Sequence, residues 1–146
     1  DQVLADLSAF KKETPKRNDV IVFLWPGDKT TLYVKRCIGV PGDKILIKDK
    51  AVFINDIAEV PPGTITYTDT TIQKISSDKP GSNTRDNWGP YIVPKDCFFV
   101  LGDNRDNSYD SRFWGPVPRD LLIGKVVRII SSPDKSRIGI YISSKE

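Results

Sequence analysis

Residues 102–112, Gly-Asp-Asn-Arg-Asp-Asn-Ser-Tyr-Asp-Ser-Arg, place three carboxylates and two guanidinium groups in one short segment that follows the apolar run at residues 97–101. A solvated turn is one interpretation, because Asp, Asn, Gly and Ser favour turns. A calcium loop is excluded by the spacing, since a loop that starts at Asp103 would put Arg105 among the cation ligands. The alternative to a solvated turn is an internal ion-pair lattice, in which Arg105 and Arg112 each bind a carboxylate through two parallel hydrogen bonds. Such a lattice would fix the loop and let Ser108 orient another polar group.

Lys35 is the second side chain that could do chemistry. In a strand, alternation places Tyr33, Lys35 and Cys37 on one face and Arg36 on the other, so one cation is expected to be drawn into the interior. One interpretation is an edge lysine that reaches water. The other is a desolvated amine whose lowered pKa makes it a general base. The chain contains no His, which excludes Ser-His and Cys-His catalysis and His-bound metal sites, and neither a metal nor a cofactor is expected.

The elements that must position these side chains are predicted to be strands. Apolar or alternating runs occur at residues 20–24, 31–40, 44–48, 51–54, 91–93, 97–101, 125–130 and 138–142. Asp49-Lys50 outlines a tight hairpin, and residues 119–124 fit one helical turn. Eleven Pro and ten Gly interrupt any long helix. The sequence therefore predicts an all-β fold of antiparallel sheets, partly closed into a barrel, with a loop-rich insertion.

The domain organisation follows from where apolar density falls. Residues 61–90 are polar, with one weak strand expected at residues 65–67, and cannot bury a core of their own. They are predicted to be an insertion within a single domain formed by residues 1–60 and 91–146. Cys37 and Cys97 lie 60 positions apart, which fits no zinc or redox spacing and leaves two buried thiols or a disulfide as alternatives.

Composition narrows the partners. The net charge of +3, from 22 Lys+Arg against 19 Asp+Glu, is small and evenly spread, so nucleic-acid binding is not expected. The longest apolar run, residues 20–25, is too short to cross a bilayer. The absence of Met predicts that the sequence is an excised or processed piece of a longer protein.

Two segments carry a family resemblance. LYVKRCIGVPGD, at residues 32–43, and FFVLGDNRDNSYDSRFWGPVP, at residues 98–118, resemble the bacterial type I signal peptidases, or leader peptidases. These are membrane-anchored serine proteases with a Ser-Lys dyad, and the resemblance covers nearly the whole chain. It implies that Lys35 is the general base and that Ser108 orients its amine. The residues implied to support them are Asp103, Arg105, Asp110 and Arg112, and those implied to line the substrate groove are Tyr33 and Val34.

One departure from the family pattern concerns the nucleophile, which the family carries in a Ser-x-Ser-Met-x-Pro-Thr-like box. The opening residues, DQVLADL, resemble the end of the stretch that follows this box, so the box is expected just upstream of Asp1. Ser8 is a poor substitute because neither Met nor Pro stands beside it. The 146-residue piece is therefore expected to be inactive and to lack the N-terminal membrane anchor.

The resemblance also implies the substrates of the protein and its location in the cell. The substrates would be secretory precursors cut after small residues of the Ala-x-Ala type, at the extracytoplasmic (periplasmic) face of the bacterial inner membrane. Trp25 and Trp114 are either membrane contacts or packed core aromatics.

The alternatives to a signal peptidase are another Ser-Lys hydrolase, such as a self-cleaving repressor or a pilin-processing relative, and a non-catalytic β-barrel that binds peptides. A repressor would carry its nucleophile within the domain and a DNA-binding region nearby, and this chain shows neither.

Overall fold

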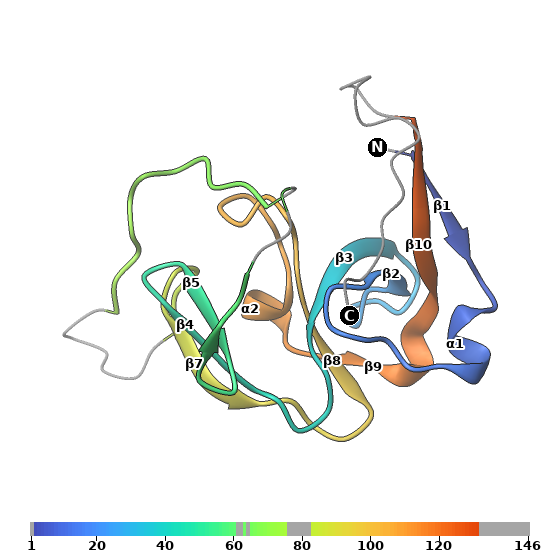
Figure 1. The fold of residues 1–146 in the computed structure, drawn as a ribbon, viewed down its shortest axis with the longest axis horizontal. Coiled ribbons are helices and arrows are strands. Elements are labelled where there is room, and N and C mark those ends of the chain that lie inside the picture. Colours follow the sequence, from blue (N-terminus) through green and yellow to red (C-terminus); the bar gives the residue numbers. More distant parts are fainter. Residues whose placement is uncertain (1, 61–62, 64, 76–82, 132–146) are drawn as a thin grey trace.

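The computed structural model describes residues 2–60, 63, 65–75 and 83–131, and strands dominate it (Figure 1). The strands are β1 (Gln2–Asp6), β2 (Val20–Leu24), β3 (Leu32–Gly39), β4 (Lys44–Lys48), β5 (Ala51–Ile54), β6 (Ile57–Ala58), β7 (Trp88–Ile92), β8 (Cys97–Leu101), β9 (Val117–Pro118) and β10 (Leu122–Ser131). The helices are α1 (Ala9–Lys12), α2 (Ser111–Trp114) and the single-turn 3₁₀ helix η1 (Arg119–Leu121).

The strands form two sheets. The larger has the order β1-β10-β2-β3-β8-β9 and the smaller the order β6-β5-β4-β7. Every pairing between these strands is antiparallel. In Figure 1 the smaller sheet lies to the left of β8, and β10 and β1 lie at the far right. The predicted all-β class with antiparallel sheets is confirmed, whereas closure into a barrel stays a prediction.

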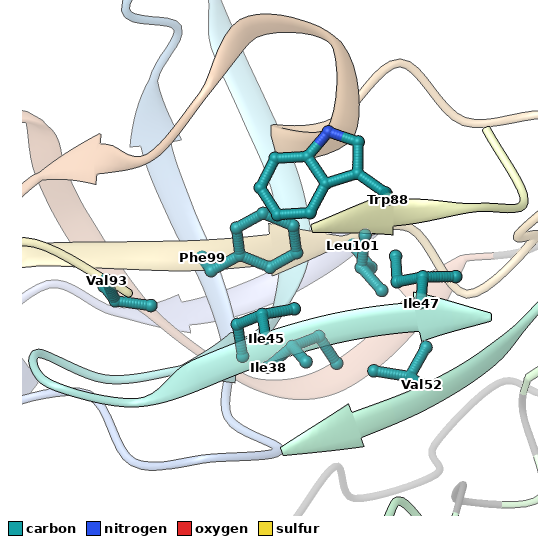
Figure 2. Packing of buried hydrophobic residues seen from close by; sticks show 8 residues of the cluster. All are labelled: Ile38, Ile45, Ile47, Val52, Trp88, Val93, Phe99 and Leu101. Atoms are coloured by element: carbon teal, nitrogen blue, oxygen red, sulfur yellow. The ribbon is translucent and has the colours of Figure 1, made fainter. Parts of the chain in front are cut away.

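A cluster of buried apolar side chains joins the two sheets (Figure 2). It consists of Ile38, Ile45, Ile47, Val52, Trp88, Val93, Phe99 and Leu101. The rings of Trp88 and Phe99 lie 4.9 Å apart between centroids, so the start of β7 packs on the middle of β8. Burying a side chain of this size stabilises the fold by about 1.5–3 kcal/mol. The cluster therefore holds the sheet that carries the β4–β5 hairpin against the sheet that carries Lys35.

Strand β2 is buried on both faces. Ile21 and Phe23 pack in a second apolar cluster with Val100, while Val20 and Val22 pack in a third with Val126. A strand covered on both sides needs a continuous apolar run instead of alternation, and this is the pattern of its sequence. Because β2 is central and apolar, the neighbouring strand β3 has a rigid partner along the half that contains Lys35.

The observed elements differ from the expected ones in a few places. The predicted hairpin is confirmed, and both residues of its turn, Asp49 and Lys50, have positive φ angles of 46° and 74°. The single helical turn is present as η1, but β10 already begins at Leu122. Trp88 lies inside the predicted polar insertion, yet it begins β7 and is buried. In place of the weak strand at residues 65–67 there is one isolated bridge, from Thr66 to Asn104. The strand expected at residues 138–142 lies outside the described residues.

Strand β1 was not expected from the sequence. Gln2–Asp6 alternates between exposed and half-buried side chains and pairs with β10. It has only three apolar residues among polar ones, so its pattern alone is too short and weak to distinguish it from a loop. Pairing with β10 supplies the hydrogen bonds that make it a strand.

Candidate active site

Lys35 and Ser108 meet in the structure, 73 positions apart in sequence. Lys35 lies in β3 opposite Ile21 of β2, and Ser108 lies in the loop between β8 and α2. The Lys35 Nζ donates a hydrogen bond of 3.0 Å to the Ser108 Oγ. The same nitrogen lies 5.8 Å from the centre of the Tyr33 ring. The amine is therefore held by a hydroxyl on one side and bordered by an aromatic ring.

The surroundings of Lys35 favour its neutral form. Burial lowers the pKa of the amine; the carboxylate of Asp110 opposes this by raising the pKa, and the guanidinium of Arg112 lowers it again. The net effect is a lowered pKa. A half-buried amine with a lowered pKa has a larger neutral fraction near pH 7 to 8, and only the neutral form can accept a proton.

Gly102 allows Ser108 to approach Lys35. A Cβ atom at this position would overlap the Ser108 Oγ and would lie 2.6 Å from the Ser108 Cβ. It would also lie 3.4 Å from the Lys35 Nζ. The hydroxyl therefore packs directly on the Gly102 backbone, in space that any other residue would fill.

A buried Asp110–Arg112 pair holds the end of the loop. The Arg112 Nε and Nη2 donate to the two oxygens of Asp110 at 2.9 Å each. Asp110 is fully buried, caps α2 by accepting from the Arg112 backbone N–H, and accepts from the Gly102 N–H at 3.1 Å. The Arg112 Nη2 also donates to the Arg105 backbone oxygen at 2.7 Å. This one pair thus connects the first residue of the loop, its middle and the helix that follows.

A second pair fixes the loop to the other face of β3. The Arg36 Nε and Nη2 donate to the two carboxylate oxygens of Asp103 at 2.9 and 2.8 Å. Successive residues of a strand point to opposite faces, so Lys35 and Arg36 reach the same loop from opposite sides of β3. The loop therefore contacts side chains from both faces of β3. These two contacts together restrict where Ser108 lies relative to Lys35.

The lattice predicted within residues 102–112 is only partly internal. Among the described residues, Asp110–Arg112 is the ion pair that joins two members of this segment. Arg105 instead pairs with Glu59, at 2.6 Å, and Asp103 pairs with Arg36. These external partners lie 46 and 67 positions away in sequence, so no local spacing could have indicated them. Each of the two pairs contains a buried arginine: Arg36 is 4% exposed and Arg105 is 2% exposed.

Tyr33 and Val34, the predicted groove residues, lie on opposite faces of β3. Tyr33 is half-buried and stacks on Trp25, with 5.8 Å between ring centroids. Trp114 meets the same ring edge-on at 6.3 Å. Val34 is 43% exposed. Trp25 and Trp114 are thus part of a packed aromatic group around Tyr33, and a membrane contact at either stays a prediction.

Comparison with known proteins places the chain in a family. The sequence profile of the family described as signal peptidase, peptidase S26, matches residues 1–131. The chain belongs to this signal peptidase family. A signal peptidase I of Leptolyngbya laminosa is 34% identical over 135 residues, which cover 87% of this chain and 58% of the relative. A probable signal peptidase I-2 of a Synechocystis strain is 29% identical over 152 residues, which cover 100% of this chain and 61% of the relative.

A solved structure supports the same placement. The crystal structure of a signal peptidase I from Enterococcus faecalis V583 matches with a TM-score of 0.55 and 27% sequence identity. The match covers 77% of this chain and 97% of that one. The chain therefore shares its fold with a signal peptidase I, while it spans about three fifths of the length of the two curated relatives.

Cys37 is buried and Cys97 half-buried, and both thiols are free. Within the described ranges, no group of three or more His, Cys, Asp or Glu side chains is arranged to hold a metal ion. A search of the same residues finds no helix with the length and apolar character needed to span a membrane.

Proposed function

We propose that the protein containing this chain is a serine endopeptidase that removes signal peptides from secretory precursors, with Lys35 as its general base. The observation that carries the proposal is the 3.0 Å contact between the Lys35 Nζ and the Ser108 Oγ in a half-buried site. With no His in the chain, a lysine with a lowered pKa is the base that remains suited to neutral pH. Membership of the signal peptidase family supports the reaction type.

The proposed reaction is acyl transfer in two steps. The hydroxyl of a serine attacks the scissile carbonyl carbon, while the neutral Lys35 amine accepts the hydroxyl proton. The tetrahedral intermediate collapses to an ester, and the proton passes to the leaving amine as the peptide C–N bond breaks. Water then attacks the ester by the same route and regenerates the serine. Ser108 and the loop that it belongs to keep the Lys35 nitrogen aimed at the nucleophile.

The proposed nucleophile lies outside residues 1–146. The Ser-x-Ser-Met-x-Pro-Thr-like box of the family requires Met, which this sequence lacks. Ser8 is exposed and donates to Asp6, and the Ser111 Oγ accepts from the backbone of Val100, so both are engaged elsewhere. The 146-residue chain by itself is therefore proposed to be inactive, and the box to stand before Asp1.

The substrate is proposed to bind as an added strand along the first half of β3. The described pairings of β8 with β3 begin at Arg36, whereas residues 32–36 pair with β2 along their other edge. The edge next to Leu32, Val34 and Lys35 is therefore open to a peptide whose backbone would extend the sheet up to the base. Leu32 and Val34, 60% and 43% exposed, would form shallow apolar contacts suited to small side chains of the Ala-x-Ala type.

The proposed setting is the extracytoplasmic (periplasmic) face of the bacterial inner membrane, with an N-terminal anchor in the full-length protein. Precursors that carry signal peptides reach the enzyme at this surface. Trp25 and Trp114, whose rings contact Tyr33 beside the site, are proposed to meet the lipid headgroups.

The test compares the 146-residue chain with the same chain extended by a Ser-x-Ser-Met-x-Pro-Thr segment, using a fluorogenic Ala-x-Ala peptide in detergent. We expect cleavage by the extended chain alone. Lys35→Ala should abolish it, Ser108→Ala should reduce it less, and Lys48→Ala, at an exposed lysine of β4, should leave it unchanged. Binding without cleavage by the extended chain would favour the non-catalytic peptide-binding module. Cleavage by the unextended chain that depends on Ser108 would reassign the nucleophile to Ser108.

A further inference from the structure

Four charged side chains that the proposed mechanism does not use lie together around Asp106, which precedes Ser108 by two residues. They are Lys50, Arg85, Asp86 and Asp106, which we call the Lys50–Asp106 cluster. The Lys50 Nζ donates to the Asp106 Oδ1 at 2.6 Å. The Arg85 Nε and Nη2 donate to the two oxygens of Asp86 at 2.8 Å each. The remaining cross-contacts, Lys50 to Asp86 and Arg85 to Asp106, are 3.8 Å each, so the four charges form one group.

The cluster is buried, which makes its geometry consequential. Both carboxylate side chains are 1% exposed, the Arg85 side chain 10% and the Lys50 side chain 14%. A buried ion pair contributes little net stability, but removing one partner leaves an uncompensated charge and is strongly destabilising. Burial raises the pKa of Asp106, but the hydrogen bond from Lys50 and the Asp69 backbone N–H outweigh it, and the pKa is lowered. Asp106 is therefore held as a carboxylate by specific donors.

The cluster connects parts of the fold that are otherwise separate. Lys50 stands in the turn between β4 and β5, and Arg85 and Asp86 lie in the segment that leads into β7, so three members flank strands of the smaller sheet. Asp106 belongs to the loop that follows β8 of the larger sheet. The backbone contributes as well, because the Lys50 backbone N–H donates to the Asp86 backbone carbonyl oxygen at 2.9 Å. Segments that flank the smaller sheet thus hold the loop, in addition to the contacts that it makes with β3.

Ser108 lies midway between two anchored carboxylates. Asp106 precedes it by two residues and Asp110 follows it by two, and both are almost fully buried. The Arg112 Nη1 donates to the Arg85 backbone oxygen at 3.2 Å, so the two anchors are also linked to each other. Between them, the backbone has little freedom to move the Ser108 hydroxyl.

We propose that Lys50 and Arg85 are positioning residues, which hold Asp106 and thereby keep Ser108 in contact with the Lys35 amine. The inference rests on the proposed function, since it concerns the general base of that reaction. Neither residue touches the amine itself. Without the cluster, the loop would remain attached at Asp103 and Asp110, but Ser108 would move away from Lys35 and admit water.

Loosening the loop has a predictable electrostatic consequence. The Lys35 amine faces Ser108, the Tyr33 ring, the Asp110 carboxylate and the Arg112 guanidinium, and burial is the largest cause of its lowered pKa. Water that enters beside the amine weakens this effect and raises the pKa toward its ordinary value. Less neutral amine is then present at neutral pH, and activity is recovered as the pH rises.

The test uses the full-length signal peptidase that contains this chain, with Lys50→Met and Asp106→Asn as the disruptive variants. We expect kcat at pH 7 to fall by about 10- to 100-fold with KM unchanged, because a displacement on the order of 1 Å has this effect. The acid limb of the pH–rate profile should move to higher pH in both variants. Lys50→Arg keeps the charge and should restore the wild-type profile. The matched control is Lys44→Met, because Lys44 pairs with the exposed Asp56 at 2.7 Å and should be silent.

Two further measurements separate the possible failures. Titration of the Lys35 amine by NMR reports its pKa without any need for turnover, and it should rise in Lys50→Met and Asp106→Asn. Asp43→Asn removes a similarly buried carboxylate, paired with Arg17, and should lower Tm without moving the acid limb. If the cluster variants lose only Tm and keep the wild-type acid limb and Lys35 titration, the positioning role is wrong. If Lys35→Ala retains activity, the proposed function itself fails, whatever the cluster variants do.

Discussion

Gly102→Ala gives the sharpest test of how the site is packed. The added Cβ would lie 2.6 Å from the Ser108 Cβ, whereas ordinary van der Waals contact begins near 3.4 Å, so Ser108 must retreat by about 0.8 Å. The Ser108 Oγ, which the new atom would overlap, would have to leave its 3.0 Å contact with Lys35. Overpacking of this kind lowers the free energy of unfolding by about 1–3 kcal/mol. The hydroxyl oxygen lies nearer the added atom than the Ser108 Cβ does, so it must move at least as far, and a displacement on the order of 1 Å should lower kcat on the order of 10²-fold.

Two readouts separate the packing effect from the catalytic effect. Chemical denaturation of the 146-residue chain measures the free energy of unfolding, and peptide cleavage by the serine-containing enzyme measures kcat. Gly63→Ala is the control, because a Cβ there meets nothing within 4 Å. Adding Ser108→Gly to Gly102→Ala removes the clashing atoms, so it should recover stability but not activity. Wild-type stability and kcat in Gly102→Ala would refute the close packing of Ser108 on Gly102.

Three further outcomes can be checked independently. The pKa of Asp106 is lowered from its ordinary value of 3.8 in the folded protein, so the stability that its carboxylate contributes is complete above pH 3.8. This stability is lost as the pH falls through the folded pKa. The Tm of Asp106→Asn should therefore fall less on acidification than that of the wild type. Burial raises the pKa of Cys37, so Ellman's reagent should modify the half-buried Cys97 before Cys37, and equal rates in the folded protein would contradict its burial. Phe99→Ala should lower the free energy of unfolding by about 3–5 kcal/mol, against about 0.5 kcal/mol or less for Ile92→Ala at a 57% exposed position.

Local pattern was enough to predict most of the strands. The unbroken apolar run of β2 indicates a buried strand, and the runs of β4 and β5 on either side of a turn indicate a hairpin. Both can be predicted because side-chain period and turn chemistry act within a few residues. Short elements that depend on a distant partner were not predictable. β1 is a strand because β10 lies beside it, and Trp88 is a core residue because Phe99 packs against it.

The candidate site divides in the same way. Lys35 and Ser108 were indicated by residue type and by resemblance to a family, and the structure brings their side chains together. The charged residues that hold the loop were harder to find. Glu59, Lys50 and Arg85 stand in segments that look like ordinary solvated chain, and their burial became evident only from the fold.

The amino-acid sequence by itself determined that this chain is built of strands and that residues 1–146 supply no His, which makes a lysine their candidate base near pH 7. These follow from composition and from periodicities of two residues, which are properties of short stretches. Only the tertiary structure decided which charge meets which. Pairing of buried charges depends on the distance between segments that are far apart in the chain, and that distance is set by how the two sheets share a core.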